Sequence, residues 1–286
     1  MNKRSGFYKN IINIPVIVYS LLLILLPLIY ILVISFLKND TYGGIVPVFT
    51  LQNYIRVFDS VYIMVFLKSF LIAGISTLIC ILIAYPFTIF VSRKSEIVKS
   101  VLMTLVIIPF LTNSLIRMYG WITLLRKSGV INTLLLNLNV IDSPLELMYN
   151  YGTIILGMVY TLLPFMILPL YSSISKISPS IIDAARDLGA KSYKIFTKII
   201  FPLTVPGLFN GSLMVFIPSI AYFFISDILG GGKLMILGNL IKNQFLTARN
   251  WPFGASISIL LLLITFILVF VYKKAGGKMD DLGGGV

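Results

Sequence analysis

The sequence has no histidine and a single cysteine, Cys80, which lies inside an apolar stretch. Without a second cysteine the chain cannot form an internal disulfide. The lack of both residue types also excludes zinc fingers and catalysis that depends on histidine or cysteine. We expect Cys80 to be a small buried hydrophobic side chain.

Charged residues are also scarce, at 12% of the chain against 58% hydrophobic residues. Soluble domains are about half apolar and about a quarter charged, so this composition excludes an ordinary soluble domain. The few charges are unbalanced, with 23 basic and 10 acidic residues and a net charge of +13. Because the basic residues fall in loops between apolar stretches, anionic lipid headgroups explain them more simply than nucleic acid does.

Six apolar stretches are long enough to cross a hydrocarbon core, which takes about 20 helical residues. The first is too long for the apolar part of a signal peptide and is followed by no small-residue cleavage site, so we expect an uncleaved span. The sequence therefore predicts an all-α polytopic protein of the inner or plasma membrane, with one transmembrane domain over residues 1–286. The six predicted spans lie near residues 14–37, 63–91, 100–125, 151–173, 204–226 and 255–272.

An even number of spans places both termini on the same side of the membrane. Of the 23 Lys and Arg residues, 14 fall on that side, 8 fall on the other side or at its edge, and Arg117 lies within a span. This bias predicts that both termini are cytoplasmic. Residues 273–286 are expected to form a flexible tail. The outer loops carry aromatic and amphipathic pieces that suit interfacial helices or a partner, and they cover residues 38–62, 126–150 and 227–254.

The most unusual segment between spans covers residues 183–202 and reads DAARDLGAKSYKIFTKIIFP. Ser178, followed by a proline, is typical of a helix start, and Gly189 suits the left-handed end of that helix. A second short helix is predicted over residues 191–201, and Pro202 is expected to end it before the next span. Two interpretations follow: an amphipathic loop lying on anionic lipid, or a helix pair that fits a groove on a cytoplasmic partner.

The segment resembles the EAA loop of ATP-binding cassette (ABC) importer permeases, whose pattern is E-A-A-x3-G-x9-I-x-L-P. An aspartate replaces the glutamate of the pattern and Phe201 replaces its leucine. The residues that fall in register with the pattern are Asp183, Ala184, Ala185, Gly189, Ile199 and Pro202. Over nearly the whole chain the sequence is also similar to the B-type permease family of spermidine/putrescine importers. The similar stretches are PFLTNSLIRMYGW (109–121), LLPFMILPLYSSI (162–174), AARDLGA (184–190) and NWPFGAS (250–256).

The resemblance implies a type I ABC importer permease fold and a coupling loop over residues 174–203. In that family the EAA helices dock on a cytoplasmic ATPase and couple ATP hydrolysis to alternating access. The implied partners are a second related permease subunit, two ATPase subunits and an extracytoplasmic binding protein that delivers the polyamine. ATP and magnesium are expected on the ATPase, with no catalytic residue and no cofactor in this chain. The stretch GGGK at 230–233 does not fit a phosphate loop, because Leu234 follows the lysine.

The end of the fifth span is predicted to carry a polar and aromatic stripe. The residues that share this helical spacing are Ser219, Tyr222, Phe223, Ser226 and Asp227. A carboxylate with aromatic faces nearby suits a polyammonium substrate through charge pairing and cation–π contact. The stripe therefore predicts part of the substrate path, unless Asp227 is simply the first residue of an outer loop.

The third span is predicted to carry a second stripe, in which Pro109, Asn113, Arg117 and Trp121 are four residues apart. Asn113 and Trp121 are further candidates for the substrate path. Arg117 either extends to the outer interface or forms an ion pair inside the bundle, with Asp227 or with the partner subunit. Because a bare arginine would repel a polyamine, we do not expect it to contact the substrate directly.

Two other classes of membrane protein are not favoured by the sequence. An intramembrane enzyme needs a catalytic constellation within its spans, and the spans hold no histidine and no pair of carboxylates. A secondary transporter often shows repeat symmetry and relays of ionisable residues, and neither is evident here. Since permeases with the same loop import many solutes, another small solute is the alternative substrate.

Overall fold

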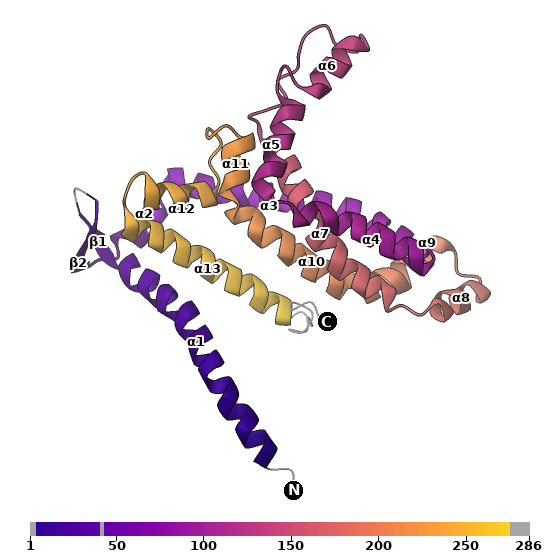
Figure 1. The fold of residues 1–286 in the computed structure, drawn as a ribbon, viewed down its shortest axis with the longest axis horizontal. Helices are drawn as coiled ribbons and strands as arrows, with labels where there is room; N and C mark the ends of the chain where they lie inside the picture. Colours follow the sequence, from indigo (N-terminus) through magenta and orange to yellow (C-terminus); the bar gives the residue numbers. More distant parts are fainter. Residues whose placement is uncertain (1–3, 41–42, 275–286) are drawn as a thin grey trace. The chain divides into compact units, whose positions relative to one another are not determined.

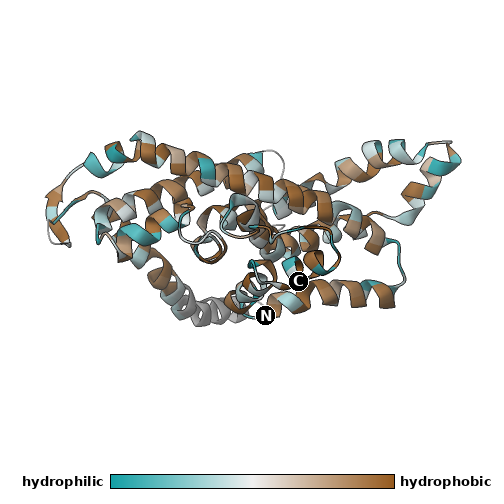
Figure 2. Ribbon diagram, turned by 90° about the horizontal axis from the view of Figure 1, so that it is seen from above, coloured by the Kyte–Doolittle hydropathy of each residue, from teal (hydrophilic) through white to brown (hydrophobic). Residues whose placement is uncertain are grey.

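The computed structural model describes residues 4–40 and 43–274. This part of the chain is mostly helical, with one two-stranded hairpin and one π-helical turn, η1 (Figure 1). By length and composition, five of its helices can each cross a membrane, or up to six spans exist if a bent helix pair counts as one. Where these long helices are coloured in Figure 2, they are mostly hydrophobic. The chain divides into two compact units, which are described separately.

The first unit comprises residues 4–40, 43–63 and 240–264 of the described chain. Its helix α1 (Arg4–Ser35) contains the predicted first span, and the large apolar side chains between Val18 and Val33 are mostly exposed. A helix that is apolar all round and exposed is typical of a membrane span in contact with lipid. A short antiparallel hairpin follows, made of β1 (Leu37–Asn39) and β2 (Ile45–Phe49). The sequence analysis did not predict this hairpin.

The hairpin and the next helix, α2 (Gln52–Val57), are held together by the end of α1. The Asn53 Nδ2 donates hydrogen bonds to the carbonyl oxygens of Ser35 and Leu37, at 3.0 and 2.9 Å. The Phe36 and Phe49 rings stack with their centroids 5.7 Å apart. The described part of this predicted outer loop therefore contains a strand pair and a helix that pack on the end of α1, and is not only a connection between spans.

The second unit comprises residues 64–239 and 265–274 of the described chain. Its buried core includes Cys80, Met118, Met158 and Leu162, so the prediction that Cys80 is a buried side chain is confirmed. The helices that lie at least partly in this unit are α3 (Ser60–Ser92), α4 (Glu96–Leu111), α5 (Ser114–Leu125), α6 (Val130–Asn137), α7 (Tyr151–Ser175), α8 (Pro179–Asp187), α9 (Ser192–Ile195), η1 (Phe196–Ile200), α10 (Phe201–Ala221), α11 (Phe223–Leu229), α12 (Leu237–Leu246) and α13 (Trp251–Lys274).

Helices α7 and α10 run side by side at very short range, because α10 carries two glycines on the facing surface (Figure 1). A Cβ atom at Gly207 would meet the Ser173 side chain and lie 2.7 Å from the carbonyl oxygen of Pro169. A Cβ atom at Gly211 would lie 2.8 Å from the Met166 sulfur. Small residues spaced by four let membrane helices approach closely, so α10 is held directly against the backbone of α7.

Two of the six predicted spans differ from the helices observed. The predicted span 100–125 is broken into α4 and α5, and the helical pair Glu96–Leu111 and Ser114–Asn137 is bent by 93°. The predicted span 204–226 belongs to a longer helical run, Ser192–Ala221, that ends before residue 226. The other four predicted spans fall within α1, α3, α7 and α13, except for residues 36 and 37 at the end of the first. Of the predicted tail, residues 273–286, the part 275–286 lies outside the described residues.

Candidate functional site

The predicted coupling loop contains a short helix, α8, whose two ends follow from local sequence. Pro179 occupies the first helical position, where its missing N–H costs no hydrogen bond. Gly189 has a φ of +75°, and the Gly189 and Ala190 amides donate to the carbonyls of Arg186 and Ala185. This is the double hydrogen bond of a Schellman C-cap, as the glycine predicted. At the start, the Ser178 hydroxyl bonds to the Ser180 hydroxyl at 2.7 Å and makes no capping hydrogen bond.

Helix α8 exposes its apolar side chains instead of burying them. Ile181 is 46% exposed and Leu188 is 89% exposed, and α8 has no buried residue. Asp183, the acidic residue of the EAA-like pattern, pairs with Arg186 at 3.0 Å on the same helix. Ala184 is exposed and Ala185 is half-buried, so small side chains lie beside the apolar ones. The helix therefore presents an apolar surface with an acidic residue.

The second half of the predicted coupling loop is continuous with the next span, so the prediction that Pro202 ends a helix is wrong. A proline has no N–H to donate to the carbonyl four residues earlier. Here the helix widens into η1 just before the proline, and the Phe201 amide donates to the carbonyl of Phe196. The helical run Ser192–Ala221 therefore continues through the proline, with a π-helical turn just before it. Ile199 is half-buried in this turn and Ile200 is buried.

The π-helical turn is fixed to the core by aromatic contacts. The Tyr85 ring packs edge-on against the Phe196 ring with centroids 5.5 Å apart. The Tyr85 hydroxyl is hydrogen-bonded to the hydroxyl of the buried Thr204 on α10. The coupling loop is thus exposed at α8 and anchored where it enters α10.

The predicted stripe of span three does not exist as one helical face. Helix α4 ends at Leu111, two residues after Pro109. The carbonyl oxygen of Pro109 accepts hydrogen bonds from both the amide and the hydroxyl of Thr112. Asn113 then starts α5 as its N-cap, with its Oδ1 accepting from the Leu115 amide at 2.8 Å. Pro109 and Asn113 therefore lie at a helix break, and the spacing of four does not align them with residues further along α5.

The two later members of that stripe lie close to one aromatic ring. Trp121 packs edge-on against Tyr160 of α7, with ring centroids 5.4 Å apart. The guanidinium carbon of Arg117 lies 5.7 Å from the centroid of the same tyrosine ring. The Arg117 Nε is buried without a hydrogen-bond partner, and Arg117 forms no salt bridge among the described residues. The predicted pairing with Asp227 is therefore not formed there.

The predicted stripe of span five is also interrupted. Helix α10 ends at Ala221, Tyr222 has ψ of +72°, and α11 begins at Phe223. Ser219 and Ser226 are buried, whereas Phe223 is exposed, so these residues do not share one surface. The break follows Pro218, whose carbonyl accepts from the Tyr222 amide.

A polar network that sequence reasoning missed holds this break together. Asn239 donates to the Asp227 carboxylate at 2.6 Å and to the carbonyl oxygen of Phe223 at 3.1 Å. The Ser226 hydroxyl donates to the carbonyl of Leu234 at 2.5 Å, and the Leu237 amide donates to the Ser69 hydroxyl at 2.8 Å. Exposed backbone groups at membrane depth need such partners. Asp227 therefore belongs to a network inside the protein and is not simply a loop residue.

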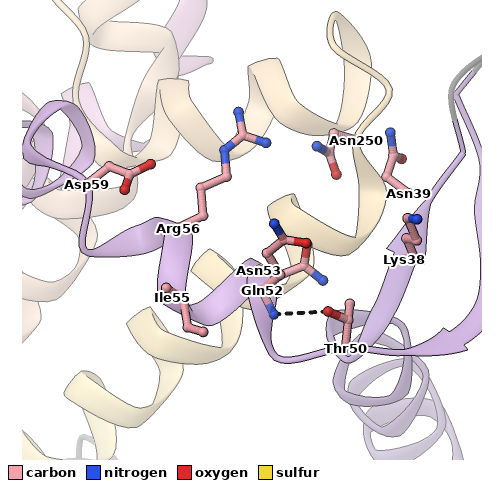
Figure 3. Close-up of a pocket in the computed structure, with 9 residues that line it drawn as sticks. All are labelled: Lys38, Asn39, Thr50, Gln52, Asn53, Ile55, Arg56, Asp59 and Asn250. Atoms are coloured by element: carbon pink, nitrogen blue, oxygen red, sulfur yellow. Dashed lines mark hydrogen bonds between the residues drawn. The ribbon is translucent and has the colours of Figure 1, made fainter.

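A pocket of about 470 Å³ lies in the first unit, between the hairpin, α2 and the residue before α13 (Figure 3). It combines the cations Lys38 and Arg56 with Asp59 and the amides of Asn53 and Asn250. The Arg56 guanidinium also lies 4.4 Å from the centroid of the Phe253 ring. Within the described residues there is no group of three or more His, Cys, Asp or Glu side chains that could hold a metal ion.

Residues 84–279 match the family of binding-protein-dependent transport system inner membrane components. The chain belongs to this family. It is 42% identical over 278 residues to the spermidine/putrescine transport system permease protein PotB of Salmonella typhimurium, with 97% of both chains covered. It is 44% identical over 267 residues to PotB of Escherichia coli K12, covering 93% of this chain and 97% of that protein. The predicted similarity to spermidine/putrescine permeases is confirmed.

Solved structures of the same fold include a chain of a bacterial ABC transporter involved in the import of alginate. The present chain matches the alginate transporter chain with a TM-score of 0.78 at 15% identity, over 95% of the present chain and 96% of the transporter chain. A second match is to the alginate transporter in complex with a periplasmic protein bound to an alginate pentasaccharide. Its TM-score is 0.77 at 16% identity, over 94% and 93% of the two chains. The predicted all-α polytopic fold of an ABC importer permease is confirmed.

Proposed function

We propose that the chain is the transmembrane permease subunit of an ABC importer for polyamines. The observation that carries this proposal is the 42–44% identity to spermidine/putrescine permeases over at least 93% of the chain. The chain forms the translocation path together with a second related permease. Two ATPase subunits hold ATP and magnesium, and an extracytoplasmic binding protein delivers the substrate. Both termini and α8 lie on the cytoplasmic side.

In this function the coupling loop transmits motion from the ATPase to the bundle. The exposed Ile181 and Leu188 dock on the ATPase together with Ala184 and the charge of Asp183. Burying an exposed leucine side chain contributes about 1.5–3 kcal/mol, so this small surface supports a specific contact. Because the helical run Ser192–Ala221 is continuous, movement of its first turn carries α10 with it.

The substrate path in this function follows the aromatic and acidic side chains of the second unit. Trp121 offers an aromatic face to a polyammonium chain, and Asp227 offers a carboxylate. Ser219, Tyr222, Phe223 and Asn113 remain candidates for the same path. On the outer side, Lys38 and Arg56 of the pocket in Figure 3 offer positive charge to the binding protein.

The test is reconstitution of the two permeases and the ATPase in proteoliposomes, with the binding protein outside. We expect ATP-dependent uptake of labelled spermidine or putrescine, and ATPase activity that rises when the loaded binding protein is added. An excess of an unlabelled amino acid or sugar should not compete. Uptake without ATP, or strong competition by another solute class, would contradict the polyamine function.

A further inference from the structure

A pocket of about 550 Å³ lies where the start of α8 meets the ends of α3 and α7, all within the second unit. Its lining carries four cationic side chains against one acidic side chain, Asp183. The cations are Arg93, Lys94, Lys99 and Arg186. The remaining wall is mostly apolar. Beside Ser92, Ser175 and Pro179 it has five isoleucines: Ile89, Ile174, Ile177, Ile182 and Ile200. The pocket therefore joins a basic region to an apolar one.

Two of the four cations already have acidic partners. Arg186 pairs with Asp183 at 3.0 Å, and Lys99 pairs with Glu96 at 2.7 Å. Arg93 and Lys94 take part in no salt bridge within the described part of the chain. The Lys94 Nζ lies 4.4 Å from the centroid of the Phe90 ring. Two exposed positive charges therefore remain available to an anion.

A helix end alone does not explain this composition. Arg93 and Lys94 directly follow Ser92, the last residue of α3, where cations complement the helix dipole. That effect acts within the last turn of one helix. It accounts neither for the further cations from α4 and α8 nor for the five isoleucines beside them. The combination points to a ligand that is itself anionic at one end and apolar at the other.

We infer that the pocket binds the headgroup of an anionic phospholipid from the leaflet that faces the ATPase. Arg93 and Lys94 contact the lipid phosphate, and the isoleucines contact the first part of an acyl chain. Basic pockets between transmembrane helices on the cytoplasmic side are suited to such headgroups. Free inorganic phosphate would leave the isoleucine wall unused. The inference rests on the proposed function for the side of the membrane on which α8 lies.

The bound lipid would act on coupling because α8 forms one wall of the pocket. Pro179, Ile182 and Arg186 come from α8, whereas Arg93 and Lys94 come from the turn that follows α3. A lipid between them connects the coupling helix to the core of the unit. The content of anionic lipid in the membrane would thus change how strongly ATPase movement reaches the spans.

The test uses the complete importer in nanodiscs of phosphatidylcholine with increasing phosphatidylglycerol. Native mass spectrometry counts the phosphatidylglycerol molecules that stay bound to the wild type, R93Q/K94Q and R93K/K94R. A matched control, K273Q/K274Q, removes two basic residues from the end of α13. Because each Lys or Arg near an anionic surface contributes about 1 kcal/mol, R93Q/K94Q should bind about thirtyfold more weakly. R93K/K94R should bind as the wild type does. The control should lose much less affinity than R93Q/K94Q, because Lys273 and Lys274 do not line the pocket.

Equal binding of phosphatidylglycerol by R93Q/K94Q and the wild type would overturn the inference. So would displacement of the lipid by millimolar inorganic phosphate, which would identify a free-phosphate site. If R93Q/K94Q lost its ATPase subunits while its lipid binding stayed unchanged, the two residues would belong to the ATPase interface instead. Since bound lipid is counted directly, a failure to import polyamines would contradict the proposed function and leave this result standing.

Discussion

Helices α8 and α11 are both short, and both follow a break in the helical chain. They differ in the burial of their side chains. Helix α8 has no buried residue, and Ile181 and the C-cap residue Leu188 are exposed. Helix α11 buries Ile225, Ser226 and Leu229. A surface kept exposed is available to a partner, whereas a buried one holds the fold together. Changes in α8 should therefore alter coupling without loss of stability, and the loss of a buried contact around α11 should lower stability.

The largest expected effect lies between these two regions, where α10 packs against α7. The substitution Gly207→Ala places a Cβ atom against the Ser173 side chain and the Pro169 carbonyl oxygen. Neither backbone can move away without separating the two helices, so we expect a loss of about 3 kcal/mol of stability. The melting temperature in nanodiscs and the yield of assembled importer measure it.

The matched control is Gly74→Ala in α3, since a Cβ atom there meets nothing within 4 Å. It should keep or slightly raise the melting temperature, because alanine favours a helix by about 1 kcal/mol over glycine. If both variants were equally stable, α7 and α10 would not be held by close backbone contact, and the connection between the two regions would be looser than proposed.

The next effect tests α8 as an exposed docking surface. The substitution Gly189→Asp introduces a negative charge at the end of α8, at a residue with φ of +75° and open space around its Cβ. We expect polyamine uptake and ATPase stimulation to fall at least about tenfold, which corresponds to about 1.4 kcal/mol of docking free energy. The amount of protein in the membrane should stay unchanged.

The control for this prediction is Gly232→Asp, in the predicted outer loop. Gly232 also has a positive φ, of +69°, and nothing within 4 Å of its Cβ. The two variants share the backbone strain and differ in place, so only Gly189→Asp should uncouple transport. Equal loss in both would assign the effect to strain and remove the docking role of α8.

The structure of α8 was predictable because its signals are local. Pro179 starts the helix and Gly189 ends it, and both act through their own backbone geometry. The error at Pro202 has the same origin, because a local rule says that proline ends a helix. A π-helical turn and the packing of Tyr85 on Phe196 override that rule. Local rules fail where packing supplies the missing interaction.

A third prediction tests whether Asp227 acts on the substrate or only on the fold. The substitution Asp227→Asn removes the charge but keeps an oxygen that can accept from Asn239. We expect the melting temperature to stay close to that of the wild type, while the KM for polyamine uptake rises about tenfold. The substitution Asn239→Ala should lower the melting temperature instead, because it leaves the Phe223 carbonyl without this donor. Unchanged uptake kinetics in Asp227→Asn would leave the residue a purely structural role.

The geometry of the predicted substrate path was harder to predict from the sequence than that of α8, because it depends on residues far apart in sequence. The spacing of four that linked Pro109 to Trp121 assumed a straight helix, and the break at Thr112 removes that alignment. Tyr160 contacts both Trp121 and Arg117, but it lies on another helix, so no spacing along the sequence links it to them. The same is true of Asn239, which lies in a loop by sequence and supports Asp227 in the fold. Such contacts become visible only once the helices are packed.

The smallest effect is expected in the predicted outer loop, far from both regions in sequence. Lys127 pairs with Glu146 at 2.6 Å, and this pairing lowers the pKa of the Glu146 carboxyl below its usual value. A lowered carboxyl pKa stabilises the fold above the pKa of the unfolded chain, and the contribution is lost as the pH falls through the folded value. Because both side chains are exposed, Glu146→Gln should leave the melting temperature nearly unchanged at neutral pH. Melting curves of the variant and the wild type at acidic and neutral pH test this expectation. A large drop in the melting temperature of the variant at neutral pH would mean that this loop is held as firmly as α11.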